Sequence, residues 1–416
     1  MNERRFSVLD EFFLQIETPQ RPTHWALVFE LEDGAAASVT ALRERVRERV
    51  REYPSLLLGA TDSSGSGPML REFDVQDAVD NVDAATVADD ADWHDLLGSL
   101  LAQPLPRDRP SWRLVRAWQR DTGVVRLVLM VHHSLADGIA GAGYAGLFID
   151  GESGQLAQLD RYLLSDRYAA PAVSPREFLS ALKGFAGGWA GGTRSRRMPQ
   201  LTGAGRRAVA AVHVSTGQVR AIAARNGAGT AEYLITAIGE SLATRTNGHR
   251  VLRAFAPATL DRSLRHSGNA VSIVLVNVDG EAQELGDRLT ATREQLNRIS
   301  DSGAPLALPV ISRAASVLPW ALRRAAARTT LAMLRPDVHI GVNPGYLNLK
   351  TVFGTNIAAV QPLSPLLGNA VSFTCLVLGK DVHIGIVWDP EAVGDLGADA
   401  ARELAARLEV VAAVGA

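Results

Sequence analysis

The sequence predicts an α/β protein made of two domains of roughly 200 residues each. The chain has 416 residues, which is more than one ordinary hydrophobic core accommodates. Apolar runs typical of strands alternate with amphipathic segments typical of helices in both halves. Between the halves the sequence becomes rich in Pro, Gly and Arg. We therefore expect a first domain over 1–166, a crossover linker over 167–205 and a second domain over 206–416.

The first half opens with a short apolar strand, expected over 27–31, and a helix. Between 37 and 52, apolar residues recur every four positions among Arg and Glu, which predicts a helix with one buried face, and Pro54 ends it. The acidic stretch 74–95 is typical of a solvated loop and the start of a helix. Residues 96–105 continue it with apolar residues at helical spacing.

Two strands complete the first half, over 111–119 and 123–133. The second ends in Val-Val-Arg-Leu-Val-Leu-Met-Val-His-His, where Arg126 is the only polar residue before the histidines. A strand that is apolar on both faces belongs in the middle of a covered sheet. Trp112, at the start of the first of these strands, is expected to lie in the core.

The second half repeats the alternation of strands and helices. Strands are expected over 208–214, 250–256, 270–278, 338–342, 355–361, 370–378 and 382–388. Helices are expected over 216–226, 230–246, 306–334 and 398–411. The glycine cluster at 184–192 follows no strand and contains no GxGxxG, so it does not indicate a dinucleotide site.

Composition excludes several classes of protein. The net charge is -2 and 21% of the residues are charged, which is typical of a globular domain and not of a nucleic-acid binder. The 43 basic residues include only three lysines, and the arginines are scattered, as in the product of a GC-rich gene. The lone Cys375 lies in an apolar run, so we expect a buried hydrophobe and a reducing compartment, with no internal disulfide or Cys-based metal site.

The sequence predicts a cytoplasmic protein. The N-terminus lacks the apolar segment of a secretory signal, and no run of about 18 apolar residues occurs. Peripheral contact with a membrane or lipid stays open, because 306–334 could include an amphipathic helix after Pro319 with several Arg. An Arg-rich helix packed on its own domain is the stronger interpretation.

The strongest chemical signal is His132-His133-Ser134-Leu135-Ala136-Asp137-Gly138, at the end of the apolar strand. Adjacent strand residues point to opposite faces, so the two histidines are not expected to share a metal ion. We expect His133 to face a cleft, where a neutral imidazole can act as general base, and His132 to orient the turn. Asp137 would cap the following helix or pair with an Arg, and Gly138 would let a substrate pass close to the backbone.

Competing catalytic motifs are absent from the sequence: there is no G-x-S-x-G, no HExxH and no P-loop. The other seven histidines are scattered and carry no motif; they are His24, His94, His213, His249, His266, His339 and His383. The alternative is that His132 and His133 are two core histidines whose ring nitrogens are hydrogen-bonded within the protein and have no catalytic role. No metal site is expected.

The His132 to Gly138 motif resembles that of the bacterial wax ester synthase/diacylglycerol acyltransferase family. That family belongs to the HHxxxDG acyltransferases, with nonribosomal peptide condensation domains and chloramphenicol acetyltransferase. Other blocks of the chain are similar to the same family: residues 6–14, Pro110-Ser111-Trp112, residues 201–207, Gly268-Asn269 and Pro344-Gly345.

The resemblance implies two chloramphenicol acetyltransferase-like domains with a tunnel between them. It also implies transfer of an acyl group from acyl-CoA or an acyl carrier protein to a hydroxyl acceptor, with no cofactor. In the family pattern His133 matches the general base and Asp137 the structural carboxylate. The loop 341–346, and within it Asn343, is our candidate for contacting the substrate and stabilising the oxyanion.

The chain departs from the family pattern in three places. Ala231-Glu232 replaces Asn-Asp, Gly341-Val342-Asn343-Pro344-Gly345-Tyr346 replaces Ser-Asn-Val-Pro-Gly-Pro, and Pro110-Ser111-Trp112 has lost a Leu. These departures fit a relative that acylates a specialised metabolite as well as one that makes storage lipid.

Two other functions remain open at the level of sequence. One is amide formation on a carrier-bound substrate, and the other is non-catalytic binding of a lipid or a carrier protein. Arginines around the linker are candidates for binding the phosphates of a donor: Arg194, Arg196, Arg197, Arg206 and Arg207.

Overall fold

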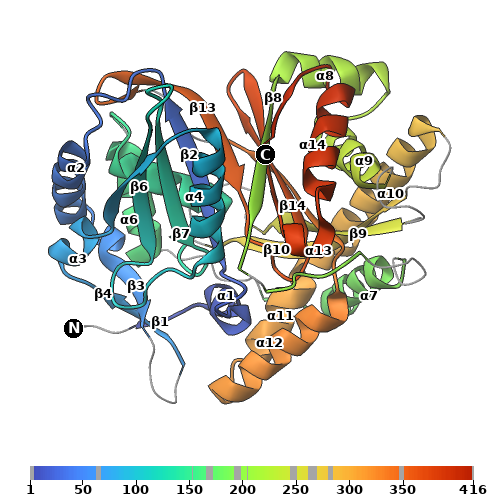
Figure 1. Ribbon diagram of the computed structural model, residues 1–416. Helices are drawn as coiled ribbons and strands as arrows, with labels where there is room; N and C mark the ends of the chain where they lie inside the picture. Colours follow the sequence, from blue (N-terminus) through green and yellow to red (C-terminus); the bar gives the residue numbers. More distant parts are fainter. Residues whose placement is uncertain are drawn as a thin grey trace.

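The computed structural model consists of two sheet-rich halves that stand side by side (Figure 1). It describes residues 4–61, 67–151, 153–164, 172–191, 198–203, 205–243, 251–260, 269–279, 284–345 and 351–414. The mixed α/β fold predicted from the sequence is confirmed.

The first half is built on a six-stranded sheet with the order β12-β13-β2-β7-β6-β5. Its strands are β2 (His24–Leu31), β5 (Val82–Val87), β6 (Trp112–Gln119), β7 (Val125–His132), β12 (Thr351–Val352) and β13 (Thr355–Leu363). The apolar strand β7 lies between β2 and β6, as its two apolar faces predict. Trp112 is fully buried and donates its indole N–H to the Leu56 carbonyl at 2.7 Å, which confirms its core position.

Helices cover both faces of this sheet. They include α2 (Val39–Glu52), α3 (Val75–Val79), α4 (Asp90–Ala102), α5 (Gly138–Gly141) and α6 (Ser153–Leu164), with the 3₁₀ helices η1 (Pro54–Leu57) and η2 (Ala142–Leu147). A small sheet, β1 (Arg4–Arg5), β4 (Met69–Glu72) and β3 (Leu58–Thr61), lies beside them. The predicted one-sided helix is α2, whose three periodic apolar residues Leu42, Val46 and Val50 are all fully buried.

The second half is built on a seven-stranded sheet with the order β10-β9-β11-β14-β15-β8-β16. Its strands are β8 (Ala208–Ser215), β9 (Val251–Thr259), β10 (Val271–Asp279), β11 (Val338–Pro344), β14 (Val371–Leu378), β15 (Asp381–Trp388) and β16 (Ala412–Val414). Helices α8 (Thr216–Arg225), α9 (Thr230–Ala243), α10 (Leu285–Ser302), α13 (Pro390–Val393) and α14 (Leu396–Arg407) accompany it. Strand β11 runs parallel to both β9 and β14.

Strands β12 and β13 belong to the second half of the chain but lie in the first sheet. Strand β13 pairs antiparallel with β2, with Pro362 opposite Leu27. It also approaches β15 closely, because a Cβ at Gly385 would come within 1.8 Å of the Pro362 carbonyl oxygen. The predicted strand over 355–361 therefore exists, but it joins the two halves instead of completing the second sheet.

The predicted linker contains a helix in its described part, α7 (Pro175–Gly191). Two of its glycines serve close packing: a Cβ at Gly184 would lie 2.1 Å from the Ser302 Oγ, and one at Gly188 would lie 2.8 Å from the Leu275 carbonyl oxygen. Tertiary contacts thus stabilise a helix whose glycine content by itself disfavours one.

Two helices of the predicted region 306–334 pack against α1 (Val8–Ile16) (Figure 1). The predicted helical region 306–334 consists of η3 (Ala304–Leu306), α11 (Ala307–Ala315) and α12 (Trp320–Leu334), with a break before Pro319. Arg328 of α12 donates to the Gln15 carbonyl at 3.0 Å, and Arg323 pairs with Glu11 at 2.5 Å. These arginines therefore anchor α12 to the protein. No helix among the described residues is long and apolar enough to cross a membrane.

Candidate functional site

A cavity of about 270 Å³ lies between the two halves. Its lining comes from β2, from the turn after β7, and from strands β9, β10, β11, β13 and β14. The polar groups that it exposes include His133, Asp137, His339, Asn343 and Thr374, among apolar side chains such as Trp25 and Val342. All four predicted site residues other than His132 therefore line a single cavity: His133, Asp137, Gly138 and Asn343.

The Phe13 ring and the Asn269 side-chain amide hold His133 in one orientation. Its imidazole stacks on Phe13 of α1, with ring centroids 3.7 Å apart and an interplanar angle of 9°. Its Nδ1 lies 3.2 Å from the Asn269 Oδ1. Burial lowers the pKa of His133 to about 4, so the ring is neutral near pH 7.

Asn269 decides which nitrogen of His133 carries the proton. The Asn269 Nδ2 donates to the His133 carbonyl at 2.6 Å and to the Asp10 Oδ1 at 2.7 Å, so the amide oxygen must face the ring. An oxygen at that position accepts a hydrogen bond, which places the imidazole proton on Nδ1. The Nε2 lone pair is then left for the cavity.

Asp137 joins the two halves through backbone groups. Its Oδ1 accepts from the N–H groups of Ile139 and Ala140, at 3.0 and 2.9 Å, and so caps α5. Its Oδ2 accepts from the Ala270 N–H of the second half at 2.9 Å. Burial raises the pKa of Asp137 to about 6 although these three donors favour the carboxylate. Of the two roles weighed from the sequence, the geometry matches the cap.

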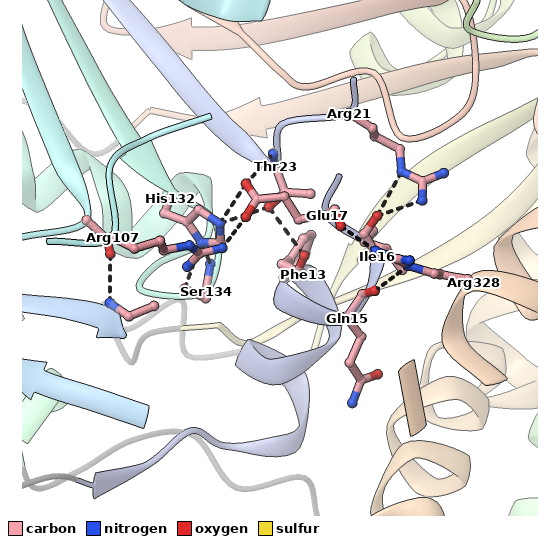
Figure 2. Close-up of polar contacts among 12 residues, drawn as sticks. Phe13, Gln15, Ile16, Glu17, Arg21, Thr23, Arg107, His132, Ser134 and Arg328 are labelled. Carbon is pink, nitrogen blue, oxygen red and sulfur yellow. Dashed lines mark hydrogen bonds and ion pairs between the residues drawn. The ribbon is translucent and has the colours of Figure 1, made fainter. Parts of the chain in front are cut away.

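His132 lies outside the cavity, in a buried polar network (Figure 2). The Ser134 backbone N–H donates to the His132 Nδ1 at 3.1 Å, so the imidazole proton is on Nε2, which lies 3.1 Å from the Glu17 Oε1. Arg107 pairs with the same carboxylate. Burial tends to raise the pKa of Glu17, but His132, Arg107 and the Thr23 N–H outweigh it and lower the pKa to about 2.

This network orients the turn that follows β7. Both nitrogens of His132 are occupied by protein groups, and the Thr23 carbonyl accepts from the His133 N–H at 3.1 Å. Arg328 extends the connection, since it donates to the Glu17 carbonyl at 2.7 Å as well as to Gln15 (Figure 2). His132 therefore has the geometry of a positioning residue.

Gly138 and Asn343 bound the cavity on opposite halves. A Cβ at Gly138 would meet nothing within 4 Å, so the cavity is open beside this residue. Asn343 lies on β11 and lines the cavity together with its neighbours Val342 and Pro344.

Three residues at the site carried no catalytic assignment from the sequence. Asn269 was noted only as part of the Gly268-Asn269 block that is similar to the family. Glu17 belongs to no sequence motif, and His339 was one of the seven scattered histidines. His339 lines the cavity, and its Nδ1 lies 2.9 Å from the Ser372 Oγ. Each depends on a contact between distant parts of the chain, which no local pattern reports.

Other residues singled out from the sequence do not line the cavity or lie outside the described residues. Arg207 was a candidate for binding donor phosphates, but it is only 7% exposed and donates to the Gln20 carbonyl at 2.9 Å, so its guanidinium serves the fold. The side chain of Glu232 pairs with Arg293 at 3.1 Å at the start of α9. Arg194, Arg196, Arg197, Gly268 and Tyr346 lie outside the described residues.

Cys375 is fully buried on β14, and burial raises the pKa of its thiol to about 12. The expectation of a buried hydrophobe is confirmed. In the part of the chain that the structure describes, no three His, Cys, Asp or Glu side chains are grouped as a metal ion requires.

Comparison with known proteins places the chain in a family. The family model described as the wax ester synthase/diacylglycerol acyltransferase catalytic domain matches residues 6–261, more than half of the chain. A probable diacylglycerol O-acyltransferase of Mycobacterium tuberculosis (strain ATCC 25618 / H37Rv) is 24% identical over 427 aligned positions, which cover 94% of this chain and 92% of the relative.

Two further similarities differ in extent. A putative diacylglycerol O-acyltransferase of Mycobacterium tuberculosis (strain CDC 1551 / Oshkosh) is 27% identical over 150 residues, so the match spans 33% of this chain and only 29% of that relative's length. The solved structure of a wax ester synthase/diacylglycerol acyltransferase from Marinobacter aquaeolei VT8 has a TM-score of 0.65 at 18% identity, covering 97% of this chain and 98% of that one. The structural likeness shows a shared fold. The chain therefore belongs to the wax ester synthase/diacylglycerol acyltransferase family, the one that its HHxxxDG motif resembles.

Proposed function

We propose that this protein transfers an acyl group from a thioester to the hydroxyl of an acceptor and so forms an ester. The observation that carries the proposal is His133, a neutral histidine in the cavity between the halves, with its Nδ1 proton held by Asn269 and its Nε2 free to take a proton. Membership of an acyltransferase family supports the same reaction.

The reaction needs only the groups already described and two substrates. The Nε2 of His133 removes the proton of the acceptor hydroxyl as its oxygen attacks the thioester carbonyl carbon. General-base assistance of this kind contributes roughly 10²- to 10⁴-fold to the rate. The tetrahedral intermediate then expels the thiolate, which takes the proton back from His133. Asp137 keeps the turn and Ala270 in place, while Gly138 and Asn343 border the reacting groups.

A direct transfer fits the residues better than an acyl-enzyme. The thiol of Cys375 is fully buried in the second core, and its raised pKa disfavours the thiolate that a covalent mechanism requires. We therefore propose acyl-CoA or an acyl carrier protein as the donor and attack by the acceptor itself.

A second, apolar cavity of about 110 Å³ supports a substrate with a hydrocarbon chain. It lies between α1, α11, α12 and β10 and shares Val271 with the first cavity. Phe13 separates the two, since it lines the apolar cavity and stacks on His133. We propose that this cavity receives part of an acyl chain or of a long-chain acceptor.

The experiment incubates the purified protein with acyl-CoAs of several lengths and follows thiol release and product. Long-chain alcohol, diacylglycerol and a primary amine serve as alternative acceptors. We expect acceptor-dependent thiol release with ester as product, abolished in His133→Ala with an unchanged thermal unfolding midpoint. Amide as the preferred product, undiminished turnover by His133→Ala, or binding of acyl-CoA without turnover would each overturn the proposal.

A further inference from the structure

His339 is the second histidine of the cavity, and nothing in the sequence motifs accounts for it. It lies on β11, which places His339, Gly341 and Asn343 at alternate positions and hence on one face. Of the residues between them, Ile340 packs in the core of the second half, while Val342 packs against that core and also lines the cavity. The strand thus presents the His339 imidazole and the Asn343 amide to the cavity, each two residues away from Gly341.

Gly341 lets these two polar side chains approach each other closely. A Cβ at this position would lie 3.2 Å from the Cε1 of His339 and 3.2 Å from the Nδ2 of Asn343. Both distances are tighter than ordinary contacts, so a larger residue at this position would push His339 and Asn343 apart. The glycine therefore lets the imidazole and the amide lie close to each other.

Ser372 determines the tautomer of His339. The two residues are directly opposite on β11 and β14, and the Ser372 Oγ lies 2.9 Å from the His339 Nδ1. Ser372 is 1% exposed and has no other side-chain hydrogen bond among the described residues, so the arrangement that leaves no buried hydroxyl proton unpaired is donation from the Ser372 Oγ to the His339 Nδ1. The proton of the neutral imidazole is then on Nε2.

His339 is suited to donating a hydrogen bond without releasing a proton. Burial lowers its pKa to about 4, so the ring is neutral near pH 7. Its Nε2 has no hydrogen-bond partner among the described residues. A fixed N–H donor in a largely buried site stabilises a developing oxyanion without reorganisation, and loss of one such donor typically costs about 10²- to 10³-fold in kcat.

We propose that His339 is a catalytic residue that donates its Nε2–H to the oxyanion of the tetrahedral intermediate, with Ser372 as its positioning residue and Asn343 as a second donor across Gly341. The inference rests on the proposed acyl transfer. When the acceptor oxygen bonds to the thioester carbon, the carbonyl π pair moves to the oxygen, and His339 and Asn343 stabilise that charge. When the carbon–sulfur bond breaks, the pair returns, and His133 returns its proton to the thiolate. His339 transfers no proton.

The test compares three variants with the wild-type protein. His339→Phe keeps a ring of similar volume but has no N–H donor. His339→Gln replaces the imidazole N–H with an amide N–H. Ser372→Ala removes the hydroxyl that fixes the tautomer of His339. We expect kcat to fall about 10²- to 10³-fold in His339→Phe, and less in the other two, with KM changing less than about threefold. Wild-type thiol release establishes the proposed function first, so that its failure is distinguished from failure of this inference.

Three readouts separate catalysis from a structural effect. His213→Phe, the same change at an exposed histidine outside the cavity, should leave kcat unchanged. A trifluoromethyl ketone analogue of the acyl thioester, whose carbonyl adds water to form a tetrahedral hydrate, should lose affinity for His339→Phe by the same factor as kcat/KM. The shape of the pH–rate profile should be retained. Wild-type kcat in His339→Phe, equal activity of the Phe and Gln variants, or loss of a limb of the pH profile would each overturn the inference.

Discussion

The amide of Asn269 in the second half donates to the backbone carbonyl of His133 in the first half, at 2.6 Å. The same amide turns its oxygen toward the His133 Nδ1 and its second N–H toward Asp10. One residue thereby joins α1, the HHxxxDG turn and the start of β10. It couples the contact between the two halves to the tautomer of the candidate base.

Replacing Asn269 with Ala should impair catalysis and stability together. Without the amide oxygen the His133 proton is no longer held on Nδ1, so we expect kcat to fall about 10- to 100-fold. The Asp10 carboxylate also loses a buried donor, which costs about 1–3 kcal/mol in the free energy of unfolding. Steady-state kinetics and chemical denaturation measure the two effects. Asn356→Ala, at an exposed side chain paired with Glu32, should change neither. A stable Asn269→Ala with full kcat would contradict the role.

Replacing Asp137 with Ala should act mainly on stability. Three backbone N–H groups lose their acceptor, and we expect the free energy of unfolding to fall by about 2–4 kcal/mol, measured by urea titration. The folded fraction should retain kcat within about tenfold. Asp137→Asn, which keeps one acceptor oxygen, should lie between Ala and wild type. A variant of wild-type stability without activity would disprove the structural role.

Two glycines three residues apart should respond oppositely to substitution. Gly138→Val should leave the thermal unfolding midpoint unchanged but raise KM about tenfold or more, because its side chain enters open space in the cavity. Gly141→Val should destabilise the protein, because even a Cβ would come within 2.0 Å of the Trp25 ring. If Gly138→Val bound and turned over substrate normally, the substrate would not pass this residue.

The acid limb of kcat/KM should lie well below the pH expected of an unperturbed histidine. Burial lowers the pKa of His133 to about 4, with His132 and His339 opposing a further positive charge, so the base form persists until the pH falls toward 4. Rates measured immediately after pH jumps from neutral solution test this. A midpoint near 6.5 would show that the free enzyme solvates His133.

Stability should decline over a higher pH range than activity. His24, His133 and His339 each have a folded-state pKa of about 4, so between about 6.5 and 4 the unfolded chain binds more protons than the folded one. The free energy of unfolding therefore falls as the pH falls through this range. Asp137, with its pKa raised to about 6, opposes the trend over part of it. Urea titrations at several pH values measure the sum, and a stability that rises on acidification would contradict it.

Local patterns predicted much of the secondary structure. The fourfold spacing in α2 and the double apolar face of β7 each reflect burial that a short segment reports by itself. Strand β5 was missed because it lies in an acidic stretch, where its alternating pattern covers only six residues. Helix α7 was missed because its glycines disfavour a helix locally, and the close contacts of Gly184 with Ser302 and of Gly188 with Leu275 exist only in the tertiary structure.

The sequence by itself determined the family, the α/β class and the candidate base, because the HHxxxDG motif is contiguous and its residues act within one turn. The tertiary structure decided which histidine faces the cavity, which nitrogen of His133 carries its proton, and that β13 crosses to the first sheet. It also brought His339 to the cavity. These features depend on hydrogen bonds and packing between residues more than a hundred positions apart, such as His133 and Asn269, and the chain acquires them only when the two halves close on each other.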